Sequence, residues 1–128
     1  AFYDEDAEYL PRMYKSSNCV VYTGSHDADC SNTWIKNISG DALTRFKKEC
    51  LAITTYKGVY AMIYLALSSK ANLSIIPIQD YLNLTNEEGR MNTPSIAYGN
   101  WTYRLSNRYA TNKLKEKIKE ITIKTNRH

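Results

Sequence analysis

The sequence has few of the residues from which metal sites and disulfide frameworks are built. Its 128 residues include three cysteines, an odd number, and two histidines. Cys19, Cys30 and Cys50 lack CxxC spacing, which argues against a disulfide framework and against a structural zinc site. A catalytic metal needs three or more converging ligands, and the second histidine, His128, is the last residue. We therefore expect reduced thiols and neither a metal nor another cofactor.

Long apolar runs and a strong charge are also missing. The longest apolar run, residues 59–67, is far shorter than the ~20 residues that a membrane-spanning helix needs. The first residues do not resemble a signal peptide, so we expect a cytoplasmic protein with no membrane partner. The net charge is +4 and comes with no recognisable nucleic-acid-binding motif, so we expect no nucleic-acid partner.

Two short apolar segments predict the strands of a parallel sheet. Residues 19–23 are rich in β-branched side chains and flanked by Asn and Gly, which is typical of a strand buried on both faces. Residues 73–78 form the second segment, with Pro77 near its end because proline cannot donate to a ladder. A crossover of about fifty residues joins parallel strands in practice. The chain is therefore expected to be α/β.

Helical periodicity appears in three segments. The first begins near Ser39 or Asp41, and the second runs from about residue 55 to residue 69 with a wide apolar face. The third begins at Ser106 or Thr111 and surrounds a narrow apolar stripe with lysines, which is typical of a solvated helix over a core.

The remaining segments are expected to be irregular. Residues 1–17 indicate a loop or a disordered tail that cannot nucleate a core, and residues 24–40 indicate a polar loop. Residues 81–99 form a longer loop, and loops of that length usually bind or cover something.

Polar side chains follow both predicted strands at their carboxyl ends. His26 and Asp27 come after the first strand, and Gln79 and Asp80 come after the second. The carboxyl ends of parallel strands share one edge of the sheet, where α/β proteins gather catalytic groups. We therefore expect these side chains to converge.

Several chemistries are compatible with His26 and Asp27. A Ser25-His26-Asp27 triad is disfavoured because adjacent residues of an extended segment point to opposite sides. Glycosidic bonds are cleaved by paired carboxylates, helped by hydrogen bonds to sugar hydroxyls that Asp27 and His26 could make. From the residues alone, a structural interpretation is equally open, in which Asp27 caps a turn and His26 packs locally.

Four motifs occur in order at residues 22–29, 76–82, 89–94 and 100–104, with the sequences YTGSHDAD, IPIQDYL, GRMNTP and NWTYR. Their order is more specific than any one of them. Together they resemble the C-terminal part of the 4-α-glucanotransferases, also called amylomaltases or disproportionating enzymes. The similarity reaches to about Arg104, and Ser25, Ala28 and Cys30 stand where Thr, Asn and Thr are expected. Residues 4–11 are also similar to the segment after the family's sixth barrel strand.

The resemblance implies a (β/α)8 TIM-barrel transferase that moves α-1,4-glucan segments between maltooligosaccharides by a retaining double displacement. By motif match, Asp27 resembles the third acidic residue of that site, which stabilises the transition state. His26 looks like the histidine beside it, and Asn92 is similar to an asparagine that contacts the sugar. The nucleophile and the acid/base lie on earlier strands of the family, so the resemblance implies an inactive fragment.

The same resemblance divides the chain into segments of one barrel. The exposed edges of the parallel strands also predict self-association. The alternative is a small self-contained α/β module that binds a glycan or a nucleic acid. The expected segments are a loop after a missing strand at 1–17, a βαβ unit at 18–80, an active-site loop at 81–105 and a closing helix at 106–128.

Overall fold

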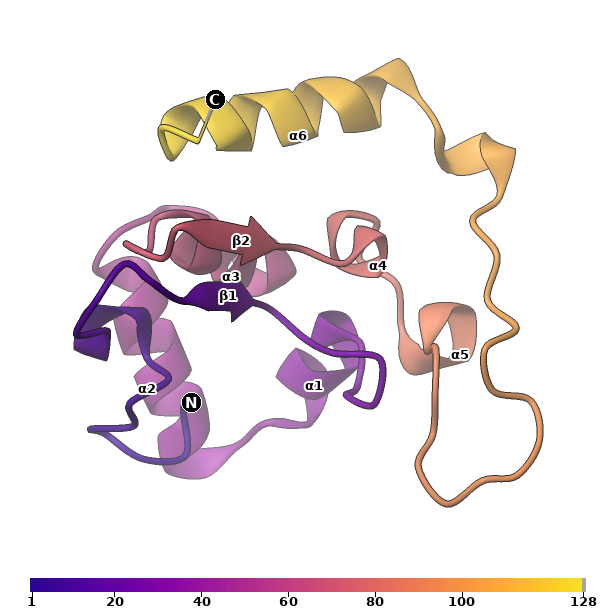
Figure 1. Ribbon diagram of the computed structural model, residues 1–128, viewed down its shortest axis with the longest axis horizontal. Coiled ribbons are helices and arrows are strands. Elements are labelled where there is room, and N and C mark those ends of the chain that lie inside the picture. Colours follow the sequence, from indigo (N-terminus) through magenta and orange to yellow (C-terminus); the bar gives the residue numbers. More distant parts are fainter. Residues whose placement is uncertain (128) are drawn as a thin grey trace.

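A computed structural model describes residues 1–127 as a short parallel sheet with helices packed against it. Strand β1 (Val20–Tyr22) pairs in parallel with β2 (Leu73–Ile75), and Val21 lies opposite Ser74. The two strands are neighbours in Figure 1, with the crossover chain behind them. The expected α/β organisation and the parallel pairing are both confirmed.

The crossover between the strands contains three helices, α1 (Ser31–Asn37), α2 (Gly40–Leu51) and α3 (Gly58–Leu67). Helix α3 is the most apolar of them and contacts α1, α2, β1 and the later helix α4. Its apolar residues pack on both sides, so it forms the centre of the core. Its buried residues are Val59, Ala61, Met62, Ile63, Leu65, Ala66 and Leu67.

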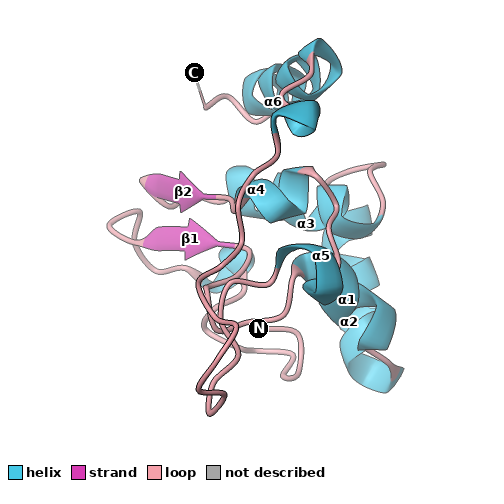
Figure 2. Cartoon of the chain, turned by 90° about the vertical axis from the view of Figure 1, so that its right-hand side faces the viewer, coloured by secondary structure: helices cyan, strands magenta, loops and turns pink. Residues whose placement is uncertain are grey.

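The sheet is packed on one face only, which corrects the expected burial of the first strand on both faces. Val21 is 6% exposed and lies with Ala66 of α3, whereas Val20 and Tyr22 are 47% and 59% exposed. On β2, Leu73 and Ile75 are each 52% exposed. Figure 2 shows the reason: helices α1 to α5 lie on one side of the two strands. The opposite face is an exposed apolar surface.

The N-terminal segment is irregular apart from one short helix, but it contributes two side chains to the core, which corrects the expectation that nothing in it could do so. Phe2 is 8% exposed and its ring lies 5.2 Å from the ring of Phe46 in an edge-on contact. Leu10, just before the 3-10 helix η1 (Pro11–Met13), is 1% exposed. These two apolar side chains close the end of the helical layer, although neither belongs to a periodic pattern.

Helices occupy parts of the two segments that were expected to be loops. Helix α1 lies within residues 24–40, and its first N–H group, that of Ser31, donates to the carboxylate of Asp80, which is 49 positions away. This distant carboxylate takes the place of a local cap, because the N-cap residue, Cys30, makes no side-chain cap hydrogen bond. Helix α5 (Asn86–Gly89) lies within residues 81–99 and begins with a capping box between Thr85 and Glu88.

The second strand is shorter than expected because the backbone turns at Pro77. Strand β2 ends at Ile75, and Pro77 precedes the helical turn α4 (Ile78–Tyr81) with φ −57°. Proline removes a ladder donor and suits the start of a helix. Gln79 and Asp80 are therefore part of a helical turn that follows the strand.

The chain ends in the lysine-rich helix that its pattern predicts. Helix α6 (Asn112–Lys124) follows the 3-10 helix η2 (Asn107–Tyr109) and is capped by Thr111, whose side chain accepts from the Leu114 N–H. Ile121 is 1% exposed and joins the core cluster of α3. Within the described residues, no helix is long and apolar enough to cross a membrane.

Candidate functional site

The structure brings the three predicted site residues together at one edge of the sheet. The side-chain amide of Asn92 donates to Asp27 Oδ1 at 2.5 Å, and His26 Nε2 lies 3.2 Å from Asp27 Oδ2. The main-chain N–H of Asn92 also donates to the main-chain oxygen of His26 at 3.1 Å. The side chains of His26 and Asp27 are 52% and 49% exposed, so the carboxylate is oriented and still open to a ligand.

An aromatic ring that the sequence motif contained without a predicted role completes this cluster. The ring of Trp101 lies 5.0 Å from the ring of His26, and its main-chain N–H donates to the oxygen of Met91 at 2.7 Å. Trp101 is 54% exposed and has a left-handed backbone, with φ +62°. Such a conformation is strained in a residue with a side chain and clusters at functional sites. The exposed ring offers apolar surface beside the polar pair.

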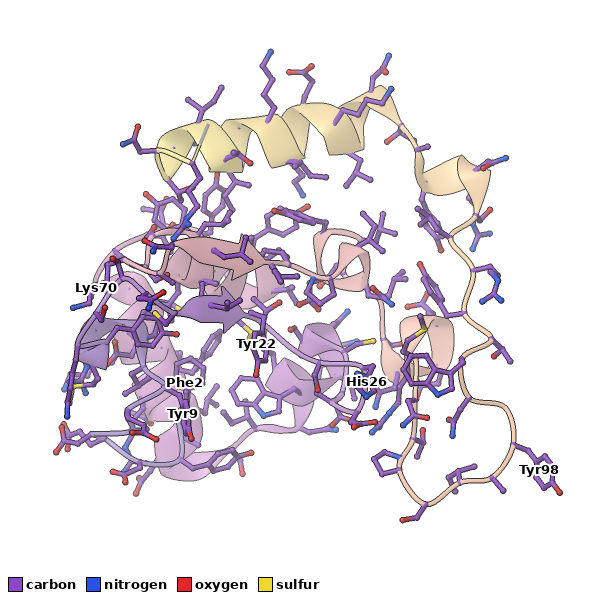
Figure 3. All side chains as sticks on the ribbon, in the orientation of Figure 1. Phe2, Tyr9, Tyr22, His26, Lys70 and Tyr98 are labelled. Atoms are coloured by element: carbon purple, nitrogen blue, oxygen red, sulfur yellow. The ribbon has the colours of Figure 1, made fainter. Side chains whose placement is uncertain are left out.

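The loop between Asn92 and Trp101 is closed by Asn100. Its side-chain oxygen accepts from the Thr93 N–H at 2.8 Å, and its side-chain nitrogen donates to the Ile96 oxygen at 2.8 Å. Tyr98 is at the tip of this loop, 89% exposed, and Figure 3 shows it pointing away from His26. The role of Asn100 is therefore to shape the loop, and Asn92 is the asparagine that faces the carboxylate.

The expected convergence of the two polar tails holds, with a correction to the role of Asp80. Asp80 is 3% exposed, and its carboxylate accepts from the Ser31 hydroxyl at 2.8 Å and from the Thr23 hydroxyl. A buried carboxylate with its hydrogen bonds satisfied joins β1, α1 and α4 and has no surface for a ligand. Asp80 is thus a structural residue behind the site, whereas Asp27 lies at its surface.

A close backbone approach sets the position of the segment that carries Asn92. A Cβ atom added at Gly89 would lie 3.0 Å from both Gln79 and Leu84 side-chain atoms, so a larger residue would have to displace these side chains by a few tenths of an ångström. The Gln79 side chain also donates to the Gly89 oxygen at 3.2 Å. Gln79 therefore contributes to the site by holding this backbone, which its place in the sequence did not indicate.

Two cavities lie near the strands. The smaller, of about 240 Å³, is lined by His26 and Gln79 from the two polar tails and by Arg90. The larger, of about 830 Å³, lies along β1 and is lined by Val20, Tyr22 and residues of the N-terminal segment and α3.

The remaining reactive groups near the site do not suit nucleophilic or metal chemistry. Burial raises the pKa of the Cys30 thiol to about 11, so this side chain is protonated at neutral pH. Within residues 1–127, no group of three or more His, Cys, Asp or Glu side chains is placed to hold a metal ion. His128 lies outside the described residues. Near the start of the chain, Glu5 contacts Lys48 of α2, on another part of the molecule.

The chain is similar to one family over most of its length. A family described as 4-alpha-glucanotransferase matches residues 1–111. The 4-alpha-glucanotransferase of Aquifex aeolicus is 38% identical over 122 residues, which are 94% of this chain and 24% of that protein. The enzyme of the same description from Clostridium butyricum is 39% identical over 121 residues, 93% of this chain and 24% of that protein.

The similarity to a solved structure agrees with the sequence comparisons. The amylomaltase from Streptococcus agalactiae in complex with acarbose superposes with a TM-score of 0.88 and 26% identity, covering 98% of this chain and 26% of that one. The chain thus spans about a quarter of the length of the proteins it matches, with the same backbone arrangement.

Proposed function

This chain belongs to the 4-alpha-glucanotransferase family, and on that premise we propose that it forms the sugar-stabilising part of a barrel enzyme that transfers α-1,4-glucan segments between maltooligosaccharides. The observation that carries the proposal is the cluster of Asp27, Asn92 and His26 at the carboxyl edge of the sheet. The proposal concerns a retaining enzyme, in which a covalent glycosyl intermediate forms on one carboxylate and is then passed to an acceptor sugar.

Retaining glycosyl transfer of this kind needs a third carboxylate that binds the sugar while the sugar ring flattens. Asp27 suits this role because Asn92 and His26 orient its two oxygens and leave further lone pairs for hydroxyl groups. Such hydrogen bonds strengthen as positive charge develops on the ring and lower the barrier. His26 and Asn92 would contact neighbouring hydroxyls, and the Trp101 ring would cover the apolar side of the sugar.

The nucleophile and the acid/base are expected to come from parts of the enzyme other than these residues. The proposal therefore assigns to this chain the binding and stabilisation of the sugar, and to the rest of the barrel the two carboxylates that make and break bonds. On its own the chain is expected to transfer no glucan.

The experiment is a chimaera in which these residues replace the matching quarter of the Aquifex aeolicus relative, assayed by disproportionation of maltotriose. The chimaera should be active, and Asp27→Ala should lower kcat by about 10²–10³-fold, the usual loss for one transition-state hydrogen-bonding group. Asp41→Ala, at an exposed position of α2, is the matched control. Full activity of the Asp27→Ala chimaera would refute the role of Asp27. Tight, salt-sensitive binding of a single-stranded oligonucleotide by the chain would favour a nucleic-acid-binding module instead.

A further inference from the structure

One arginine side chain joins the two segments that carry the candidate site residues. Arg90 Nη1 lies 2.6 Å from Asp29 Oδ1, Nη2 donates to the main-chain oxygen of Asp27 at 3.0 Å, and Nε donates to the main-chain oxygen of Asn92 at 2.9 Å. The Arg90 side chain is only 22% exposed. Its guanidinium therefore contacts the backbone of both residues whose side chains meet in the site.

We propose that Arg90 is a positioning residue for glucan transfer, whose guanidinium holds the loop of Asp27 against the segment of Asn92 in the arrangement that binds the sugar. The role in transfer rests on the proposed function, whereas the positioning itself can be measured in the chain without any activity.

The anchoring side of this contact is well fixed. Arg90 directly follows α5, and Asp29 is held a second time by the side-chain nitrogen of Asn86 in the same helix, at 2.7 Å. The Asn86 side-chain oxygen also accepts from the Cys30 N–H at 2.8 Å. Helix α5 thus holds the far end of the loop at residues 29 and 30 by hydrogen bonds, and Arg90 holds the same loop at Asp27. Without Arg90, the carboxylate of Asp29, whose side chain is 35% exposed, would lose its charged partner.

The contact requires an arginine because three different nitrogen atoms serve three acceptors. A different nitrogen of the planar guanidinium contacts each of the acceptors on Asp29, Asp27 and Asn92. A lysine has a single nitrogen atom at the end of its side chain, which cannot lie within hydrogen-bonding distance of all three acceptors. We therefore expect Arg90→Lys to keep the charge and lose the positioning.

The test compares Arg90→Lys and Arg90→Gln with a matched control in the full chain. The control is Arg127→Lys, because Arg127 also serves several backbone acceptors, the oxygens of Leu67, Ser69 and Ala71, on another part of the molecule. Two NMR readouts report the arrangement: hydrogen exchange of the Asn92 N–H, which donates to the His26 oxygen, and the nuclear Overhauser effect between the His26 and Trp101 rings.

We expect both Arg90 variants to lower the protection of the Asn92 N–H by about tenfold or more and to abolish the ring contact, with Arg127→Lys leaving both unchanged. Unchanged protection and an intact ring contact in the Arg90 variants would overturn the proposal. If the variants unfold, hydrogen exchange of the arginine side chains in the wild-type chain still tests the proposal. The Nε–H of Arg90 should exchange more slowly than that of the exposed Arg104, and equal rates would also overturn it.

The catalytic part of the proposal is measured in the chimaera with the Aquifex aeolicus relative. A displacement of about 1 Å in a catalytic arrangement costs about 10²-fold, so Arg90→Lys should lower kcat by roughly that factor, with a smaller change in KM. If NMR shows the loss of positioning and kcat is unchanged, the role in transfer fails while the positioning holds. If the parent chimaera transfers no glucan, the proposed function fails, and the NMR result decides the positioning alone.

Discussion

The side-chain amide of Asn92 donates to the carboxylate of Asp27 at 2.5 Å, although 65 positions separate the two residues. Asn92→Ala removes this donor and leaves the carboxylate free to rotate. In the chimaera we expect a fall in kcat of about 10²-fold, the cost of a misplaced group, measured with maltotriose. Asn37→Ala, at an exposed asparagine of α1, should have no effect. Equal activities of the two variants would contradict the role of this hydrogen bond.

The buried carboxylate of Asp80 should be important for stability. Asp80→Ala leaves the Ser31 N–H and the hydroxyls of Ser31 and Thr23 without their acceptor, so we expect the free energy of unfolding to fall by about 3 kcal/mol. Urea denaturation measures this change. Asp41→Ala, whose side chain is 90% exposed, should change it by less than about 0.5 kcal/mol. A loss at Asp80 no larger than at Asp41 would show that the buried contacts contribute little.

Helix α6 contributes one buried side chain to the core. Ile121 is 1% exposed, so Ile121→Ala should leave a cavity and cost about 2–5 kcal/mol of unfolding free energy. Ile123, two residues further on, is 52% exposed, and Ile123→Ala should cost less than about 0.5 kcal/mol. Thermal denaturation of both variants tests the docking of α6, and similar melting temperatures would contradict it.

The open face of the sheet should make the chain associate with itself. Val20, Tyr22, Leu73 and Ile75 expose apolar side chains beside unpaired strand edges, which is a common cause of association. We expect sedimentation velocity to show species larger than the monomer, and Val20→Lys to shift them toward the monomer. Leu51→Lys is the control, because Leu51 is 72% exposed on α2. A wild-type monomer at all concentrations would refute this prediction.

The buried thiols should make the stability fall at high pH. Burial raises the pKa of Cys50 to about 12, and nearby Glu49 adds to the rise. The thiol has its ordinary pKa of about 9 in the unfolded chain and therefore ionises there at a lower pH than in the folded chain. Its contribution to the stability of the fold is complete below about pH 9 and is lost as the pH rises to about 12. Urea midpoints at pH 8 and pH 10 should therefore differ more for the wild type than for Cys50→Ala. An identical pH dependence would contradict this.

The pattern of the chain predicted the regular elements whose residues are periodic. Helices α3 and α6 follow from helical periodicity, the two strands from short apolar runs and their parallel pairing from the length of the crossover, and all were found. Helix α5 had a local signal as well, the capping box of Thr85 and Glu88, that the loop composition concealed. Helix α1 and the burial of Phe2 had no such signal, because Asp80 and Phe46, their partners, lie far along the chain.

Asp27 and Asp80 show where the sequence by itself stops. Each acid follows an apolar strand, and the sequence alone determined that both lie at the carboxyl edge of a parallel sheet. Only the tertiary structure decided that Asp80 is buried among the donors of Ser31 and Thr23, while Asp27 remains half-exposed with Asn92. The physical reason is that exposure and hydrogen-bond partners depend on packing between residues 49 to 65 positions apart, which no local pattern records.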